Sequence, residues 1–295
     1  NLLQTSIVNL KNAEFAFKQA QNTLEEQRRQ LTFQVMNAYF QVLRVQQKVE
    51  IEKISVEEAQ ENLEVAENKF SLGDANEIDV MEAENRLSSD KLALMQATDD
   101  LEISRLNFNK VLGLPLEFPF ELTDTFSVEP LIISLKESIE KALKNRYEMK
   151  KTEDDAELAR IEWELTQNEY TPQLEKKKAR IQLDSARLDL EKMKREISLE
   201  INELFRDVQE KQANIHIAQK KEEIEKETYR IAQEQYRAGL LSTTELLDAQ
   251  INLTQAQIEA TDAVFNYNLA KRELLKAVGE ELEYHEEESA ERAEG

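Results

Sequence analysis

Side chains that commonly carry out chemistry are scarce in this sequence of 295 residues. It has no Cys, which excludes thiolate nucleophiles, disulfides and Cys–zinc sites. Its two His residues are His216 and His285, and it lacks a His-Glu-x-x-His pair, a phosphate-binding loop and a catalytic triad signature. His285 lies in an acidic run that could attract a metal weakly, although a solvated tail explains the run better. We therefore predict no catalytic residue, no metal site and no cofactor, and a protein that is not an enzyme.

Three carboxylates have a spacing that suggests a role. Asn76 and Ser242 are each followed three residues later by a carboxylate, Asp79 or Glu245, which is the spacing of a helix capping box. Asp79 and Glu245 can therefore stabilise the start of a helix, and they could also line an opening at the same place. Asp248 lies too deep in its helix to cap it, which favours the second role for this residue.

The remaining composition describes the elements that must hold these residues. The chain has only five Gly, four Pro and one Trp, whereas 33% of its residues are charged. Few helix breakers and many helix formers predict a small number of very long helices. The net charge of −22 argues against a nucleic-acid partner.

An internal repeat organises the chain. An offset of 166 residues separates Gly73 from Gly239, and the same offset separates Gly113 from Gly279. Further positions align at this offset without a gap, including Ala13 with Ala179, Tyr39 with Phe205, Phe70 with Tyr236, Ala83 with Ala249 and Leu87 with Leu253. This agreement predicts a tandem duplication, with residues 13–113 as one copy and 179–279 as the other.

Each copy has the pattern of a coiled-coil hairpin. Apolar residues seven apart form one line in the first copy, namely Val35, Val42, Val49, Val56, Leu63 and Phe70. A second line is broken at Glu52 and consists of Leu31, Ala38, Val45, Ala59 and Ala66. The second copy matches the first line with Ile201, Val208, Ile215, Tyr229 and Tyr236. These heptads predict helices over about 13–72 and 77–112, and the equivalent pair in copy two. Gly73 and Gly239 would form the tight turns.

The predicted fold is all-α, with two tandem antiparallel hairpins and a mixed middle segment. The first hairpin repeat covers residues 1–113, the middle segment covers 114–178 and the second repeat covers 179–279. Within the middle segment, residues 131–168 are predicted to form two helical pieces that break near Asn145 and Arg146. Residues 280–295 are acidic, and we expect them to be disordered.

The sequence resembles the outer membrane efflux protein (TolC) family. Both hairpin tips carry an aromatic, a Gly three residues on, and an acidic-apolar-apolar-acidic-Ala run, and both second helices end at a Gly. The stretches that match are 69–73, 77–83 and 111–115 in copy one, and 235–239, 244–249 and 277–279 in copy two. Further likeness lies in residues 37–40, 142–146 and 170–174, so that the resemblance covers nearly all of residues 1–279.

The resemblance implies a transport function. In this family three chains form a homotrimer, in which six hairpins make a hollow α-barrel across the periplasm, below the cell outer membrane. The barrel is a passive conduit for exported small molecules or proteins. It belongs to a tripartite pump, in which hairpin tips dock a periplasmic adaptor (membrane-fusion) protein that connects to an inner-membrane transporter.

The resemblance also suggests which residues act. The predicted entrance or gating residues are Asp79, Tyr236, Glu245 and Asp248. The predicted tip residues for adaptor docking are Leu72, Gly73, Asp74, Ala75, Gly239, Leu240, Leu241 and Ser242. Tyr236 matches a family aromatic that helps to latch the tips, but a core position is favoured for it because Phe70 fills the equivalent place without a hydroxyl. Leu241 replaces an Arg of the family's latch, which predicts a different gate.

One feature departs from the family. A pair of membrane strands is expected after Leu174, and another before residue 1, but residues 175–178 lead straight into the next helix. No segment alternates apolar and polar residues as a membrane strand does. We therefore interpret the chain as the periplasmic helical portion without its membrane strands, and expect it to be soluble.

A scaffolding coiled coil without a pore is the alternative function. Periodicity alone does not separate the two, but a helix in a hollow cylinder contacts neighbours on both sides. The first copy has apolar residues off its main seam, at Phe33, Phe40, Ile51 and Ile54. This pattern favours packing on two sides and hence the duct.

Overall fold

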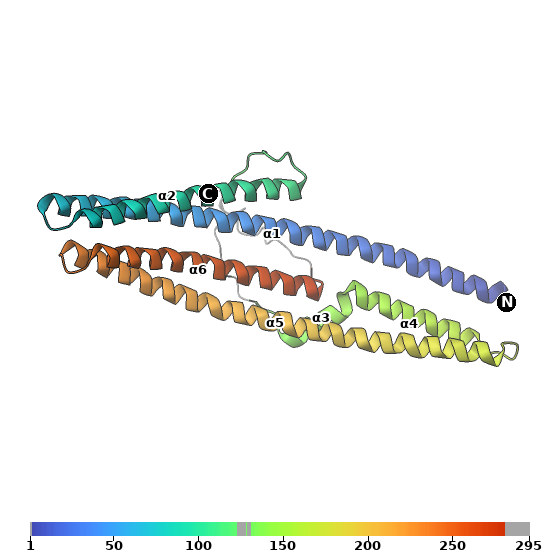
Figure 1. Ribbon diagram of the computed structural model, residues 1–295. Helices are drawn as coiled ribbons and strands as arrows, with labels where there is room; N and C mark the ends of the chain where they lie inside the picture. The colour runs from blue at the N-terminus through green and yellow to red at the C-terminus, as the bar shows by residue number, and fades with distance from the viewer. Residues whose placement is uncertain (1, 123–127, 129–130, 281–295) are drawn as a thin grey trace, which may run out of the picture. The chain divides into compact units, whose positions relative to one another are not determined.

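The computed structural model of the chain describes residues 2–122, 128 and 131–280. Every regular element within these ranges is an α-helix (Figure 1). The helices are α1 (Leu2–Leu72), α2 (Glu77–Leu112), α3 (Leu135–Asn145), α4 (Tyr147–Leu165), α5 (Gln173–Arg237) and α6 (Thr243–Val278). The all-α prediction is confirmed, whereas the tail predicted to be disordered lies, apart from Glu280, outside the described residues.

The two hairpins turn where the glycines predict. Gly73 and Gly239 have φ angles of 83° and 75°, which a residue without a Cβ adopts at low cost. The following amides, of Asp74 and Leu240, each bond 2.9 Å back to a carbonyl five residues earlier. These bonds satisfy carbonyls that the helix end would otherwise leave free, so α1 and α5 stop in the same way.

Two helix starts differ from the prediction. α1 begins at Leu2 rather than near residue 13, and α5 begins at Gln173 rather than at 179. The carbonyl of Pro172 accepts a bond of 3.0 Å from the amide of Glu175, so the helix starts directly after this proline. A proline at a helix start costs no hydrogen bond, because the first amides of a helix have no intrahelical partner. Residues 175–178 therefore lie inside α5.

The described chain divides into two compact units, to which α1, α5 and α6 each contribute a part. The first unit contains residues 1–33, 130–208 and 270–295, and the second contains 34–129 and 209–269. In the first unit, α4 is tied to α1 by an ion pair of 2.7 Å between Asp154 and Lys18. Arg146, at the break between α3 and α4, pairs with Glu200 of α5. The break itself lies where the sequence predicts it.

Equivalent residues form the core of each hairpin in the second unit. Between α1 and α2 the buried cluster consists of Ala59, Leu63, Ala66, Ala83 and Leu87. Between α5 and α6 it consists of Tyr229, Ala232, Tyr236, Leu246, Ala249 and Leu253. Most members correspond at the offset of 166, so the repeat is present in the packing as well as in the sequence. Small Ala residues at these positions let the two helices approach closely.

Two residues of the predicted seam are exposed. The side chains of Leu31 and Phe70 are about half exposed. Tyr236, the equivalent of Phe70, is buried because Leu241 packs on its cluster. Copy one has the smaller Ala75 where copy two has Leu241, so Phe70 lacks this cover.

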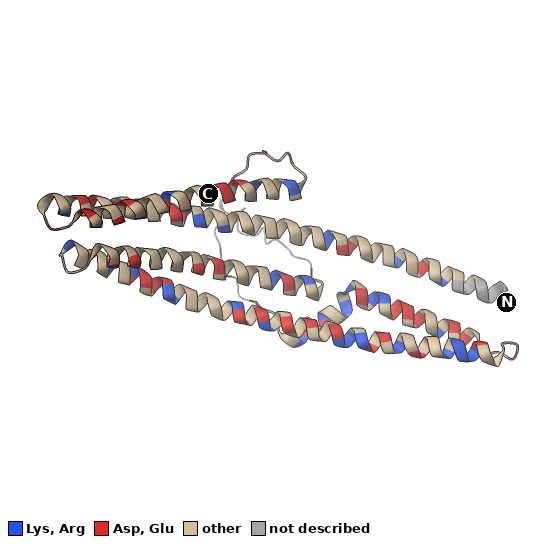
Figure 2. Ribbon diagram, viewed as in Figure 1, with Lys and Arg blue, Asp and Glu red and all other residues tan. Residues whose placement is uncertain are grey.

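Charged residues are interleaved along every helix rather than gathered in one patch (Figure 2). Many form exposed pairs one turn apart, such as Arg230 with Glu227 at 2.7 Å. Such pairs stabilise a helix by only about 0.2–0.5 kcal/mol each. Among the described residues, no helix combines the length and the apolar composition that crossing a membrane requires.

Candidate functional site

The hairpin tips carry two capping boxes. Asn76 accepts bonds from the amides of Ile78 and Asp79, and Asp79 accepts one of 2.8 Å from the amide of Asn76. In copy two, Glu245 accepts from both the hydroxyl and the amide of Ser242, at 2.7 and 3.0 Å. These bonds from Ser242 hold the pKa of Glu245 below its usual value, because they stabilise the carboxylate. Asp79 and Glu245 therefore cap their helices. A role at the entrance would come in addition to capping.

Tyr236 lies in the core of the second hairpin. Its ring is buried, its hydroxyl lies 3.2 Å from the hydroxyl of Thr243, and the ammonium of Lys69 lies 3.8 Å from its ring centre. Lys69 also donates to the backbone carbonyl of Tyr236. Tyr236 therefore occupies the core position that the sequence analysis favoured. Its contacts with Lys69 also join α5 to α1.

The residues predicted to form the docking surface at the tips differ in their exposure. Leu72 and Leu240 are more than three-quarters exposed, whereas Leu241 is half-buried against the core of its hairpin. Leu241, one of the residues predicted to dock an adaptor, therefore packs on the hairpin core, and each tip exposes one leucine. Asp248 is exposed on α6, one turn beyond the cap.

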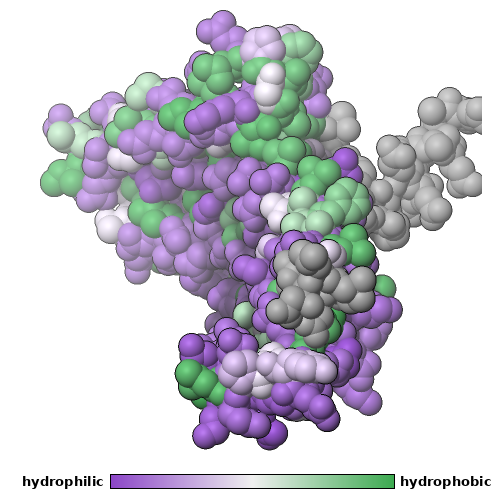
Figure 3. Space-filling view, turned by 90° about the vertical axis from the view of Figure 1, so that its right-hand side faces the viewer, coloured by the Kyte–Doolittle hydropathy of each residue, from purple (hydrophilic) through white to green (hydrophobic). Residues whose placement is uncertain are grey.

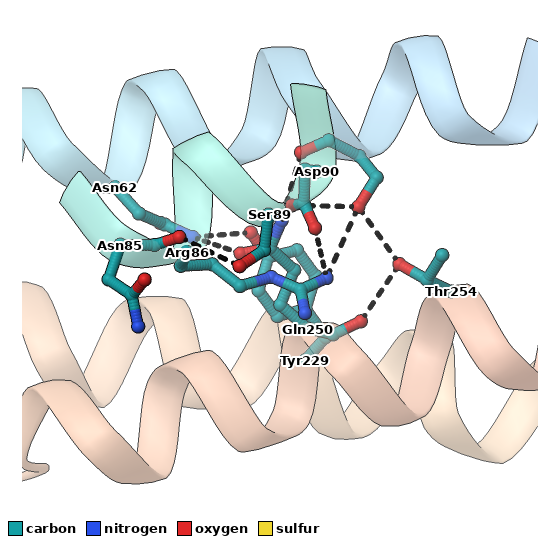
Figure 4. Close-up of polar contacts among 9 residues, drawn as sticks. Asn62, Asn85, Arg86, Ser89, Asp90, Tyr229, Gln250 and Thr254 are labelled. Carbon is teal, nitrogen blue, oxygen red and sulfur yellow. Dashed lines mark hydrogen bonds and ion pairs between the residues drawn. The ribbon is translucent and has the colours of Figure 1, made fainter. Parts of the chain in front are cut away.

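Below the tips, a buried polar network joins the two hairpins (Figure 4). Asp90 of α2 is at its centre and pairs with Arg86 at 2.8 Å. Asp90 also accepts bonds from the hydroxyl of Ser55 at 3.1 Å and from the amide of Gln250 at 3.2 Å. Three donors from three helices thus converge on one buried carboxylate, which offsets part of the cost of burying it.

Two amide side chains extend this network. Gln250 is fully buried and donates to the backbone carbonyl of Ser55 at 2.9 Å. Asn62 donates to the side-chain oxygen of Gln250 and to the hydroxyl of Tyr229, both at 3.0 Å. The hydroxyls of Ser55 and Thr254 lie 3.1 Å apart. All four helices of the second unit therefore take part.

Burial raises the pKa of the carboxyl groups in and around this network. Burial, followed by the charges of Glu61 and Asp90, raises the pKa of Glu58 to about 7, against the opposing effect of Arg86 and Lys226. Burial likewise raises the pKa of Glu52 and of Asp90. A carboxyl group whose pKa is raised to about 7 thus lies within electrostatic reach of Asp90 on α2 and Lys226 on α5.

Sequence reasoning did not find this network. One feature of the sequence pointed to it. Glu52 interrupts the second apolar heptad line of α1, and this residue is buried. Ser55 and Asn62 lie on the same stretch of α1 and are buried as well. A run of buried polar residues beside a coiled-coil seam indicates a polar contact with a further helix.

A groove of about 400 Å³ lies between α1, α2 and α6. Arg44 pairs with Asp262 at 2.7 Å and Lys48 with Asp100 at 3.8 Å along its walls. Both basic groups are thus already neutralised, so the groove has no free charge for an anionic ligand. Within the described ranges, no group of three or more His, Asp or Glu side chains could hold a metal ion.

The fold and tips define a class of protein, an all-helical chain built from two tandem hairpins. The chain belongs to the outer membrane efflux protein family, whose model matches residues 7–114 and 173–280. The two matched ranges are themselves 166 residues apart, in agreement with the repeat. This family consists of channels rather than enzymes, and it places the chain at the outer membrane and periplasm, as predicted.

Solved structures share the fold. The outer-membrane channel OprN superposes with a TM-score of 0.74 at 17% identity, over 93% of this chain and 71% of that one. CmeC of Campylobacter jejuni gives 0.73 at 17% identity, over 95% and 69%. VceC of Vibrio cholerae gives 0.71 at 14% identity, over 94% and 76%. No curated protein matches the chain in sequence.

Proposed function

We propose that the chain forms the helical wall of a trimeric efflux duct. Three copies bring six hairpins together around a water-filled passage, and exported small molecules or proteins pass through it without chemical change. The observation that carries this proposal is a set of apolar stripes that none of the described residues covers.

The stripes have the heptad spacing of packing surfaces. On α1, exposed apolar side chains recur every seven residues at Leu10, Phe17, Leu24 and Leu31. On α5 they recur at Leu174, Ile181 and Leu188, and again at Ile217, Ile224 and Ile231. A view onto the end that carries the start of α1 shows hydrophobic residues exposed among hydrophilic ones (Figure 3). Burying each such side chain would contribute about 1.5–3 kcal/mol, so these faces favour contact with further helices.

A scaffolding coiled coil explains these stripes less well. A simple helical hairpin has one apolar seam, and here that seam is already filled by the clusters of each hairpin. Additional stripes on other faces are expected when each helix has neighbours on both sides, as in the wall of a cylinder.

The tips have the properties of an entrance and a docking surface. Asp79, Glu245 and Asp248 place carboxylates at or near the turns, where three copies would form acidic rings that favour cations. Leu72 and Leu240 expose apolar side chains there, which suits docking of a periplasmic adaptor that links the duct to an inner-membrane transporter. Gly73, Asp74, Ala75, Gly239, Leu241 and Ser242 shape the same turns.

The test is the mass in solution by light scattering at low and moderate salt. We expect about three times 34.3 kDa for the wild-type chain. Leu24→Glu places a charge in the α1 stripe and should dissociate the trimer. Ile132→Glu is the matched control, because Ile132 is highly exposed outside the stripes and its replacement should leave the mass unchanged. A wild-type monomer at every concentration would contradict assembly through these stripes.

A further inference from the structure

Arg86 on α2 supplies a guanidinium to the buried network (Figure 4). One of its terminal nitrogens pairs with Asp90 at 2.8 Å and also donates to the hydroxyl of Ser55 at 3.5 Å. Its Nε is buried and has no hydrogen-bond partner among the described residues. A guanidinium carries five N–H donors, so Arg86 can still bind a second carboxylate.

Three carboxyl groups lie within electrostatic reach of this guanidinium. Burial raises the pKa of Glu52, Glu58 and Asp90, and the charge of Arg86 acts to lower all three pKa values. One guanidinium cannot balance three buried carboxylates. The cluster therefore favours keeping a proton on one of its acids, and the acids share the guanidinium unequally.

Glu58 is placed to reach the unpartnered nitrogen. It follows Ser55 by three residues on α1, so the two side chains lie on the same face of the helix. Arg86 already contacts Ser55, which puts its guanidinium about one helical turn from the carboxyl group of Glu58. Glu58 is half-buried, and the charges of Arg86 and Asp90 both act on its pKa.

The other groups around the cluster compete weakly for these acids. Lys48 is shared with Asp100, Lys226 is exposed, and burial raises the pKa of Tyr229, which keeps its hydroxyl neutral. Glu61 is exposed and adds only negative charge. The groups that face the cluster are thus Lys48 and Glu61 of α1, Lys226 and Tyr229 of α5, and the neutral Gln250 and Thr254 of α6.

We propose that Glu58 and Asp90 compete for Arg86, so that a proton on Glu58 keeps the two hairpins of one chain in firm contact. With the proton in place, Arg86 pairs with Asp90, which also accepts bonds from Ser55 and Gln250 and so joins α1, α2 and α6. When the proton leaves to solvent, the Glu58 carboxylate accepts from the free Nε and draws the guanidinium away from Asp90.

The contact between hairpins is then firmer in mild acid than in mild base. Asp90 without Arg86 is a buried carboxylate held only by neutral donors, which is costly. The folded pKa of Glu58 is raised to about 7, so the contact is complete below this pH and loosens as pH rises through it. The exchange takes place within one chain and does not require that copies assemble.

Distances between the two tips measure how firmly the hairpins are held. Nitroxide labels on Leu72→Cys and Leu240→Cys suit pulsed electron spin resonance, because both leucines are exposed, one on each hairpin, and the chain has no Cys of its own. Dilution with unlabelled chain restricts the measured distances to single chains. We expect one narrow distance at pH 6 and a second, longer distance at pH 8. Glu58→Gln should keep the narrow distance at both values, whereas the control Glu57→Gln should behave as the wild type.

Double-mutant cycles identify the carboxyl group that Arg86 binds. Arg86→Gln is combined with Asp90→Asn in one cycle and with Glu58→Gln in the other, and urea unfolding is measured at pH 6 and pH 8. From pH 6 to pH 8 we expect the coupling of Arg86 with Asp90 to fall roughly fivefold, expressed in the unfolding equilibrium constant, and its coupling with Glu58 to rise by a similar factor. If Arg86→Gln does not fold, Arg86→Lys takes its place, because it keeps the charge but loses the forked geometry.

Three results would overturn the proposal. Tip distances of the wild type that are the same at pH 6 and pH 8 would show that no proton controls the contact. Distances that change equally in Glu58→Gln would assign the proton to another group. Couplings of Arg86 that are constant with pH would exclude the exchange of partners. The mass in solution enters none of these measurements, so the proposed duct stands or falls separately.

Discussion

The side chain of Gln250 on α6 donates a hydrogen bond of 2.9 Å to the backbone carbonyl of Ser55 on α1. Each hairpin is held together by an apolar cluster, but the contact between hairpins runs through this bond and the network around Asp90. Apolar clusters tolerate small shifts, whereas hydrogen bonds depend on distance and direction. The polar contact therefore fixes how the hairpins register against each other.

Removing the Gln250 amide should destabilise the contact between hairpins. Gln250→Met keeps the approximate shape but leaves Asp90 and Asn62 each without one partner. Buried polar groups that lose a partner cost about 1–3 kcal/mol, so we expect a loss of about 2 kcal/mol in urea unfolding. Gln255→Met is the control, because Gln255 is exposed on the same helix. Equal effects of both variants would contradict a structural role for the network.

Glu58 should make stability depend on pH. Its folded pKa of about 7 lies above the usual 4.5, so the folded chain binds a proton more tightly than the unfolded chain. Stability from this group is therefore full below about pH 4.5 and is lost as pH rises through 7. Glu58→Gln should remove that loss and stabilise the protein at pH 8 by about 1 kcal/mol, allowing for partial solvent screening.

Thermal unfolding between pH 5 and pH 8 measures this effect. Glu57→Gln is the matched control, since Glu57 is the exposed neighbour. If the wild type and Glu58→Gln keep a constant difference in unfolding temperature across this range, Glu58 does not titrate as described.

The helices and turns were predictable because their signals are local. A heptad, a Gly and a capping box such as Asn76 with Asp79 each act within a few residues, and all three agree at the tips. The start of α5 was missed because the detected repeat begins at residue 179, whereas the helix begins directly after Pro172, where a proline suits a helix start.

The network was not predictable because its contacts join distant parts of the sequence. Ser55 and Thr254 are 199 residues apart, and Asn62 and Gln250 are 188 apart. None of these residue types is unusual in a helix of this composition. Only their burial, which depends on how the hairpins pack, distinguishes them from solvated neighbours.

Two turn glycines should respond differently to an added methyl group. Gly239 and Gly279 have similar φ angles of 75° and 76°, so alanine at either position costs about 1–2 kcal/mol of backbone strain. A Cβ at Gly239 would meet nothing within 4 Å, whereas at Gly279 it would lie 2.9 Å from the Cβ of Asn145. We expect Gly279→Ala to be the more destabilising, by 1 kcal/mol or more. The double variant Gly279→Ala with Asn145→Gly should recover the difference in urea unfolding.

The cap at Ser242 should control the ionisation of Glu245. Its hydroxyl and amide hold the pKa of this carboxyl below 4.5, so the group stabilises the folded chain above that pH and loses the effect as pH falls. Ser242→Ala removes the hydroxyl bond of 2.7 Å and should raise the pKa of Glu245 towards its usual value in a carbon-13 NMR titration. Ser71→Ala is the control, because Ser71 is an exposed serine at the other tip that bonds to a backbone carbonyl. An unchanged titration of Glu245 would show that the bond from Ser242 is not what lowers its pKa. A raised pKa would leave more of the carboxyl groups neutral in mild acid, so any ring that they form at the entrance would attract cations less strongly there.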